Sequence, residues 1–228
     1  MAKIVTDSLP WKLATWLIPL IIAIVFHEVS HGLVANALGD PTARLRGRLS
    51  FNPVRHIDPF GTLLLPMLLA VTGAPVFGWA KPVPVVARRL RNPRWHMIIV
   101  ALAGPGMNLL LALVAAAMMA ALVALAPTGV GWAFLGQNLL NFVAINIFLA
   151  IFNLIPLPPF DGGHVVEGLL PPALAIQYGK LKRFGFLLLI ILLLVIPQLF
   201  PGADIVERII GPPVGWLMHA LLPSVLRS

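Results

Sequence analysis

Residues 26–32 read Phe26-His27-Glu28-Val29-Ser30-His31-Gly32 and lie near the C-terminal end of a long apolar run, 13–38. In a helix, residues four apart lie on one face, so His27 and His31 can bind one metal ion through their imidazoles. Glu28 lies beside them, placed to take a proton from a metal-bound water. The alternative is two structurally satisfied histidines with a paired glutamate. Each ionised group in an apolar span costs roughly 2–3 kcal/mol to insert, which favours a functional metal centre.

The composition is that of an integral membrane protein. Of 228 residues, 59% are hydrophobic and only 11% are charged, with a mean hydropathy of +0.95. We expect one membrane domain over 1–228, multi-pass in a cell membrane and in contact with the lipid bilayer. The absence of cysteine leaves His, Asp, Glu or Asn to hold any metal. The net charge of +8 fits basic cytoplasmic loops, and we expect no nucleic acid partner.

The expected fold is an all-α polytopic membrane protein with about five to six transmembrane or re-entrant helical segments. These segments are 13–38, 60–76, 95–126, 134–155, 184–200 and 205–226. The segment 60–76 contains two glycines and two prolines, so it is either re-entrant or a marginal span. Two short extended stretches, 46–51 and 78–85, predict a small membrane-associated β element.

The basic residues give an independent indication of topology. Twelve of the sixteen Lys and Arg residues fall in three blocks, 44–55, 81–94 and 180–183. The positive-inside rule places all three blocks in the cytoplasm if 60–76 is re-entrant, with the turn at 127–131 outside. His27, His31 and Asp161 then lie at comparable depth near the cytoplasmic face. If 60–76 crosses the membrane, one basic block lies outside and this agreement is lost.

A third ligand is needed, because catalytic zinc usually has three protein ligands and one open position for water. Asp161 is the candidate, since it follows an asparagine-rich span and a proline-broken turn. Irregular backbone at membrane depth is tolerated where it lines a cavity, which favours a site at this turn. Asp161 can instead be an ordinary helix N-cap before two glycines. His164 is the alternative ligand.

Two asparagines have roles that the sequence leaves open. Asn153 lies eight residues before Asp161, and its amide can donate to a developing oxyanion or hold an extended substrate strand. An interhelical hydrogen bond is the alternative for Asn153. For Asn108 the same two roles apply, and the structural one is favoured.

Five motifs between residues 26 and 164 occur together in a characteristic order and spacing. They are His27-Glu28-Val29-Ser30-His31, 51–59, 78–84, Gly104-Pro105-Gly106-Met107-Asn108, and Asn153 with Asp161-Gly162-Gly163. In these motifs the chain resembles the site-2 protease family of intramembrane zinc metalloproteases, in the compact prokaryotic form without PDZ or CBS domains. The resemblance implies one Zn²⁺ per chain held by His27, His31 and Asp161, with Glu28 as general base and Asn153 as a substrate or oxyanion contact. It also implies hydrolysis of peptide bonds in or near transmembrane segments of membrane-protein substrates.

Two other functions compete with proteolysis: a membrane metal transporter and a non-proteolytic zinc-binding membrane protein. A transporter needs ligands along a continuous polar path, and acidic residues are nearly absent from the apolar segments. A degenerate regulatory site does not require Glu28, which is present. The sequence leaves open the substrate, the gate, the oligomeric state, and the choice between zinc and another divalent ion.

Overall fold

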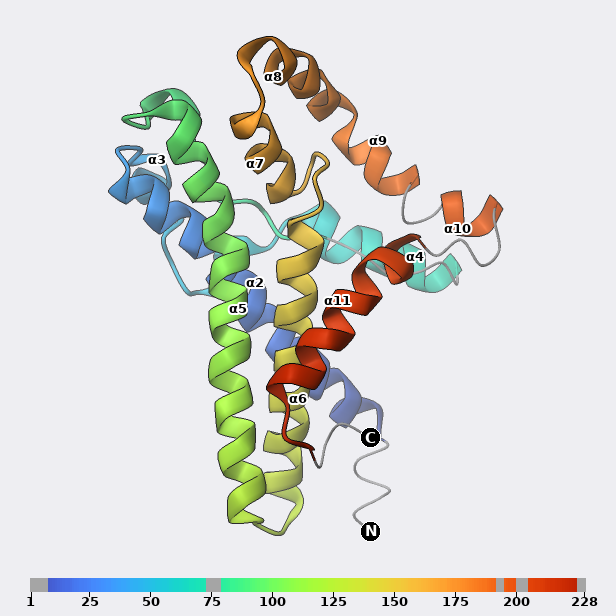
Figure 1. The fold of residues 1–228 in the computed structure, drawn as a ribbon. Coiled ribbons are helices and arrows are strands. Elements are labelled where there is room, and N and C mark those ends of the chain that lie inside the picture. Colours follow the sequence, from blue (N-terminus) through green and yellow to red (C-terminus); the bar gives the residue numbers. More distant parts are fainter. Residues whose placement is uncertain (1–7, 73–78, 192–194, 200–204, 225–228) are drawn as a thin grey trace.

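Three long helices dominate the computed structural model, which describes residues 8–72, 79–191, 195–199 and 205–224 (Figure 1). They are α2 (Leu9–Ala37), α5 (Pro93–Leu125) and α6 (Val130–Asn153). Each of the three is long and apolar enough to cross a membrane. The predicted helical segments 13–38, 95–126 and 134–155 are thereby confirmed.

Local capping fixes where these helices begin and turn. The side chains of Ser8 and Asn92 accept hydrogen bonds from the first turns of α2 and α5, each at 3.4 Å. At the far end of α5, Ala126 adopts a left-handed conformation with φ of 42°. Gly129, with φ of 116°, then precedes α6. Because glycine adopts this conformation without a Cβ clash, the chain reverses within the predicted turn 127–131.

The helices pack through small and branched residues rather than through a large apolar core. One buried cluster joins α5, α6 and the segment that follows α11 (Ile205–Leu221): Ala112, Ala115, Ala116, Met119, Leu139, Val143, Ile147 and Leu222. Figure 1 shows α11 crossing α6 at this point. On the outer faces, Leu17 and Leu113 are 47% and 52% exposed. Such an apolar exterior suits lipid, in which packing and interhelical hydrogen bonds hold helices together.

Buried amides supply those interhelical hydrogen bonds. Asn141 Nδ2 on α6 donates to Thr15 O on α2 at 2.8 Å. Asn108 Nδ2 on α5 donates to Asn146 Oδ1 on α6, also at 2.8 Å. Asn108 and Asn146 are fully buried. The structural role favoured for Asn108 is therefore confirmed.

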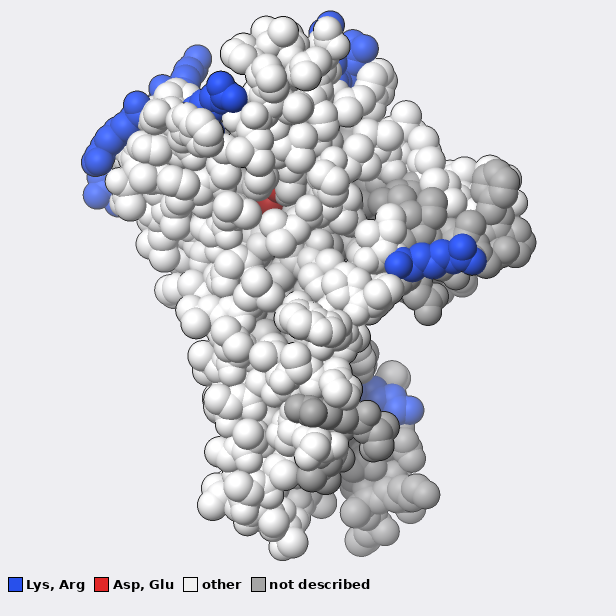
Figure 2. Space-filling model, viewed as in Figure 1, with Lys and Arg blue, Asp and Glu red and all other residues white. Residues whose placement is uncertain are grey.

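Most of the visible Lys and Arg residues lie toward one end of the molecule (Figure 2). The C-terminal end of α2 and the start of α5 meet there, and Arg91 N donates to Leu38 O at 3.1 Å (Figure 1). Figure 2 shows Lys and Arg over α3 (Thr42–Leu45), over the start of α5, and beside α8 (Pro172–Gly179). On the same face, the flank of the α5–α6 hairpin carries no charged residue.

The other predicted segments form shorter helices. Within 60–76 lie η2 (Pro59–Leu64), a π-helix, and α4 (Leu65–Thr72), whose 6 and 8 residues reach about 21 Å together. That is less than the roughly 30 Å of a bilayer core, and residues 73–78 lie outside the described part. The segment 184–200 begins where η4 (Lys180–Phe184) ends, and it contains α9 (Gly185–Ile190) and α10 (Ile196–Leu199). Three spanning helices are found among the described residues, so the count of five to six stays a prediction.

The predicted β element is not formed in the described residues. Neither 46–51 nor 79–85 contains a strand, and residue 78 lies outside the described part. Pro82 and Pro84 have no N–H to donate to a ladder. The N–H of Val83 instead donates to a side chain of α2, Glu28.

Side chains also bind two other backbone groups near Val83, the carbonyl of Lys81 and the N–H of Val86. Arg48 Nη2 donates to Lys81 O at 2.6 Å, where a partner strand would donate. Val86 N donates to Asp40 Oδ2 at 2.6 Å. The prolines of this segment predicted an extended strand partner for 46–51. The segment instead makes isolated backbone hydrogen bonds, from Trp79 N to Gly61 O at 3.1 Å and from Lys81 N to His56 O at 2.8 Å, and its other groups bond side chains.

Asp40, just after α2, is the buried anchor of this segment. It is 0% exposed and accepts hydrogen bonds from Thr42 N at 3.0 Å and from Val86 N. Burial raises the pKa of the Asp40 carboxyl, but the hydrogen bonds from Thr42 and Val86 and the nearby Arg89 outweigh it. The pKa of Asp40 therefore lies below its usual 3.8.

We expect Asp40→Asn to lower the free energy of unfolding by about 1–3 kcal/mol near neutral pH, because the buried N–H of Thr42 and the half-buried N–H of Val86 lose a carboxylate acceptor. Because the pKa of Asp40 is lower in the folded state than in the unfolded state, its carboxylate stabilises the fold at any pH above the unfolded-state pKa. This contribution is lost as the pH falls through the folded-state pKa. The difference between wild type and variant should therefore shrink below about pH 4. Unfolding in detergent across this pH range measures it. Asp58→Asn, which removes the same charge at a partly exposed N-cap, is the control, and an equal or pH-independent loss contradicts the prediction.

Candidate metal centre

Three potential ligand atoms from two helices converge at one point. His27 and His31 lie on successive turns of α2, and Asp161 is the first residue of α7 (Asp161–Leu169). The two Nε2 atoms are 3.0 Å apart, and Asp161 Oδ2 lies 3.3 Å from each. Both imidazoles are buried, and the Asp161 side chain is 18% exposed. The three residues predicted from sequence are thus brought together.

The hydrogen bonds behind the rings fix which nitrogen carries the proton. Asn108 turns its Oδ1 toward His27 because its Nδ2 donates to Asn146, so His27 Nδ1 is the donor in their 2.6 Å contact. His31 Nδ1 lies 2.7 Å from Val100 O and must also donate. A neutral imidazole has a single N–H, so both Nε2 atoms present lone pairs. Such partners typically orient metal-binding histidines.

This arrangement fits a divalent cation. With neutral imidazoles held in this way, two Nε2 lone pairs and a carboxylate oxygen face one another, and Asp161 Oδ2 is buried without a hydrogen-bond partner among the described residues. Atoms bound at roughly 2.0–2.1 Å to a tetrahedral zinc ion lie about 3.3–3.4 Å apart. The triangle of 3.0, 3.3 and 3.3 Å has nearly that size. Three ligands would leave one position for water.

Helix α5 passes directly behind both rings, and Gly104 makes this possible. A Cβ at Gly104 would lie 2.4 Å from His31 Nε2 and 2.5 Å from His27 Cε1. Val100, whose carbonyl holds His31, lies four residues before Gly104, and Asn108, which holds His27, lies four residues after it. One face of α5 therefore holds both imidazoles.

A close approach of α7 to the end of α6 positions Asp161. A Cβ at Gly162 would lie 2.3 Å from Leu154 O, so only glycine lets the first turn of α7 pack here. Phe160 occupies the N-cap position, and no side chain caps the helix. Asp161 is consequently not the N-cap that sequence offered as an alternative, and its carboxylate is directed at the imidazoles.

Glu28 is oriented by the segment that was predicted as a strand. Its Oε2 accepts a hydrogen bond from Val83 N at 2.7 Å. Val83 is buried, and the proline on either side leaves its N–H as the single backbone donor of 82–84. Arg48 holds this segment from the other side through Lys81 O. The carboxylate of Glu28 is therefore fixed beside the two histidines of the same helix.

The remaining candidate residues lie apart from the triangle. His164 Nδ1 is 3.7 Å from Glu167 Oε2, and His164 is not one of the three converging ligands. Burial, and then Lys182, lower the pKa of His164. Asn153 ends α6, and its Nδ2 donates to Leu149 O of the same helix at 2.9 Å. The role of Asn153 toward substrate stays a prediction.

Sequence reasoning missed the residues that support the site. The contact of Asn108 with His27, the participation of Asn146, and the space made by Gly104 were not anticipated. A signal was present, because Gly104 and Asn108 are four residues apart, the same spacing as the two histidines. Two helices that present matching four-residue repeats can place these residues against each other.

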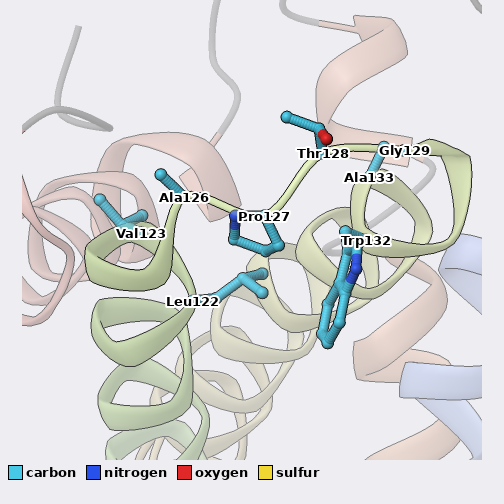
Figure 3. Close-up of a pocket in the computed structure, with 8 residues that line it drawn as sticks. All are labelled: Leu122, Val123, Ala126, Pro127, Thr128, Gly129, Trp132 and Ala133. Atoms are coloured by element: carbon cyan, nitrogen blue, oxygen red, sulfur yellow. The ribbon is translucent and has the colours of Figure 1, made fainter.

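An apolar hollow elsewhere in the molecule has no part in this site. It lies between the end of α5 and the start of α6, at the reversal of the hairpin (Figure 3). Leu122, Pro127 and Trp132 are among the residues that line it, and none of its lining residues is titratable. It offers no metal ligand.

Comparison with known proteins gives a consistent result. The model of the family described as peptidase family M50 matches residues 15–137 and 129–196, which include the whole triangle. A Bacillus subtilis (strain 168) protein with the name "Putative zinc metalloprotease YwhC" is 38% identical over 180 residues, 77% of this chain and 78% of that protein. No solved structure matches the chain.

Two mycobacterial relatives both have the name "Putative zinc metalloprotease Rip2". The protein of Mycolicibacterium smegmatis (strain ATCC 700084 / mc(2)155) is 30% identical over 184 residues. That of Mycobacterium tuberculosis (strain ATCC 25618 / H37Rv) is 32% identical over 188 residues. Each match covers 80% of this chain and 66% of the relative.

The close approach at Gly104 can be tested directly. We expect Gly104→Ala to reduce bound metal well below one ion per chain, because the added methyl group overlaps both imidazoles. Gly106→Ala is a matched control two residues along α5, since its Cβ would meet nothing within 4 Å. Elemental analysis of purified protein, with circular dichroism to verify helix content, measures both. Equal metal content in the two variants would contradict this account of the site.

Proposed function

The chain belongs to peptidase family M50, the site-2 protease family of intramembrane zinc metalloproteases, and we propose that it cleaves peptide bonds in or near transmembrane segments of membrane-protein substrates. The proposed zinc ligands are His27, His31 and Asp161, with Glu28 as general base and Asn153 as a contact to substrate. The observation that carries this assignment is the buried convergence of three lone-pair atoms at the spacing of a tetrahedral zinc site.

The chemistry divides between the metal and the protein. Bound zinc supplies Lewis acidity, which polarises a carbonyl group and lowers the pKa of water. Asn108 and Val100 keep the histidine lone pairs directed at the ion through the hydrogen bonds at Nδ1. Burial of both imidazoles excludes bulk water from behind the site and strengthens its electrostatic interactions.

Glu28 is the proposed proton carrier. Its carboxylate takes a proton from the attacking water and returns it to the leaving amine. The Val83 N–H holds one carboxylate oxygen and thereby limits rotation of the side chain during both transfers. In this proposal Asn153, the last residue of α6, donates its amide to the substrate carbonyl in place of the hydrogen bond that it makes to Leu149 O.

The membrane arrangement that we propose has one multi-pass domain over residues 1–228 in a cell membrane. The helices α2, α5 and α6 cross the bilayer, the segment that contains η2 and α4 is re-entrant, and α9 to α11 supply the remaining membrane segments. The exposed apolar side chains of α4, such as Met67 and Val71, support contact with lipid. The partners are the bilayer and substrate helices.

A substrate helix must unwind locally, because its turns shield the scissile carbonyl. Unwinding in lipid leaves backbone groups unpaired at several kcal/mol each. The N–H groups of Val83 and Val86 already bond carboxylates, so this segment offers few free donors to an added strand. The cost of unwinding therefore falls mainly on the substrate, and we propose that good substrates carry Gly, Pro or Asn near the cleaved bond.

A metal transporter fits the structure less well. Transport requires ligands along a path through the membrane, alternating between its two sides. Among the described residues, the acidic and histidine ligands form one closed cluster near one end of the spanning helices. The intact and oriented Glu28 also favours hydrolysis over a non-proteolytic zinc-binding role.

Metal content and activity should separate the proposed roles. We expect about one zinc per chain, lost in His27→Ala, His31→Ala and Asp161→Ala. Glu28→Gln should keep the zinc and lose hydrolysis, because it removes the base but no ligand. Asn153→Ala should keep the zinc and lower kcat by roughly 10²–10³-fold. Elemental analysis and cleavage of a single-span substrate measure these effects, and full zinc occupancy in Asp161→Ala would remove Asp161 from the ligand set.

Topology can be mapped because the native chain has no cysteine. Single cysteines at Arg46→Cys, Arg88→Cys and Lys182→Cys should react with an impermeant maleimide only from the cytoplasmic side. Thr128→Cys, in the α5–α6 turn, should react only from outside. If Arg46→Cys and Arg88→Cys react from opposite sides, then the segment between them is a full span and the re-entrant assignment is wrong.

A further inference from the structure

The helix that carries Asp161 is held at its far end by an arginine from another helix. Arg94, in the first turn of α5, donates from Nε to Gly168 O at 2.8 Å. Its Nη2 donates to Leu170 O at 2.9 Å and to Leu169 O at 3.5 Å. These three carbonyl groups are the last of α7 and its C-cap.

The need for such a partner follows from helix geometry. The last carbonyl groups of a helix have no donor within it, and they carry the negative end of the helix dipole. The last turn of α7 contains no basic residue of its own. A guanidinium group offers several N–H donors in a rigid plane together with a positive charge, so Arg94 serves as the C-cap of α7 from outside.

The two helices also touch where Arg94 binds. A Cβ at Gly168 would lie 2.5 Å from Ile98 Cγ1 on α5, so the end of α7 sits directly on the first turns of that helix. Helix α7 has only 9 residues, about 13 Å in length. Because a short helix moves as a rigid body, fixing its C-terminal end on α5 restricts where its first residue, Asp161, can lie.

We propose that Arg94 is a positioning residue for the metal centre, because its clamp on the C-terminal end of α7 places Asp161 against the two imidazoles. The proposal rests on the ligand set of the proposed function. It also explains how one helix sets all three ligands: α5 holds His27 and His31 through Asn108 and Val100, and it holds Asp161 indirectly through Arg94.

The test measures metal affinity, which does not depend on activity. We expect Arg94→Gln to weaken zinc binding roughly 10–100-fold in competition with a chelator, the range seen when supporting contacts of a metal ligand are removed. Arg94→Lys keeps the charge without the planar fork and should lie between Arg94→Gln and wild type. Arg91→Gln removes the same charge three residues away and should bind zinc as wild type does. Unchanged affinity in Arg94→Gln overturns the proposal.

A double-variant comparison distinguishes positioning of Asp161 from general stabilisation. Asp161→Ala should not retain zinc through purification, so its weak residual affinity is measured by titration with excess zinc, which loads the remaining histidine pair. Adding Arg94→Gln in this background should cause no further loss of that residual affinity. An additional loss of the same size as in the wild-type background would show that Arg94 acts through the whole fold, which overturns the proposal. If Arg94→Gln does not fold, Arg94→Lys takes its place in both comparisons.

A spectroscopic readout tests the geometry itself. Cobalt-substituted wild type should show the strong visible absorption of a tetrahedral ion, and Arg94→Gln should lose part of this intensity if Asp161 is displaced. Amide hydrogen exchange over 162–169 in the metal-free protein should be faster in Arg94→Gln than in Arg91→Gln. If wild type itself binds no metal, the proposed function fails. If wild type binds metal and Arg94→Gln matches it, only the present proposal fails.

Discussion

The structure depends on a small buried region in which two imidazole nitrogens and a carboxylate oxygen converge on one point. Lone pairs of His27 and His31 and a carboxylate oxygen of Asp161 lie within 3.3 Å of one another in a buried site. Such a group is unfavourable unless a cation balances it. Much of the surrounding fold directs the Nε2 atoms to this point, because Asn108 and the Val100 carbonyl bind the Nδ1 atom of each imidazole.

Helix α5 unites the support of the site although it contributes no ligand. Along one helix, Arg94 contacts α7, Val100 and Asn108 contact the imidazoles, and Gly104 leaves room for them. In lipid the hydrophobic effect does not draw helices together, so specific hydrogen bonds and close backbone approach decide their register. The buried hydrogen bond between Asn108 and Asn146 therefore aligns α5 with α6. The same contact orients Asn108 toward His27.

Sequence was a good guide wherever a single helix determined the outcome. The four-residue spacing of His27 and His31 and the lengths of the three apolar helices follow from periodicity alone. Asp161 could be predicted because few acidic residues follow a broken span. The β element was predicted but is not formed in the described residues. Side chains of Arg48 and Asp40 take hydrogen bonds that a strand partner would make, and such long-range contacts leave no local pattern. The choice between Asp161 and His164 likewise depended on the packing of Gly162 against Leu154.

The uneven distribution of basic residues has a consequence for how the molecule sits in an energised membrane. Twelve of the sixteen Lys and Arg residues lie in three blocks near one end of the spanning helices, and the flank visible in Figure 2 is almost uncharged. With a membrane potential of 100 mV, negative inside, moving one positive charge from the inside to the outside costs about 2.3 kcal/mol. In the proposed topology, with all three blocks in the cytoplasm, an inverted molecule would be opposed by the potential at every basic block at once. In that topology the electrical field that cells maintain for transport would also keep the metal centre facing one compartment.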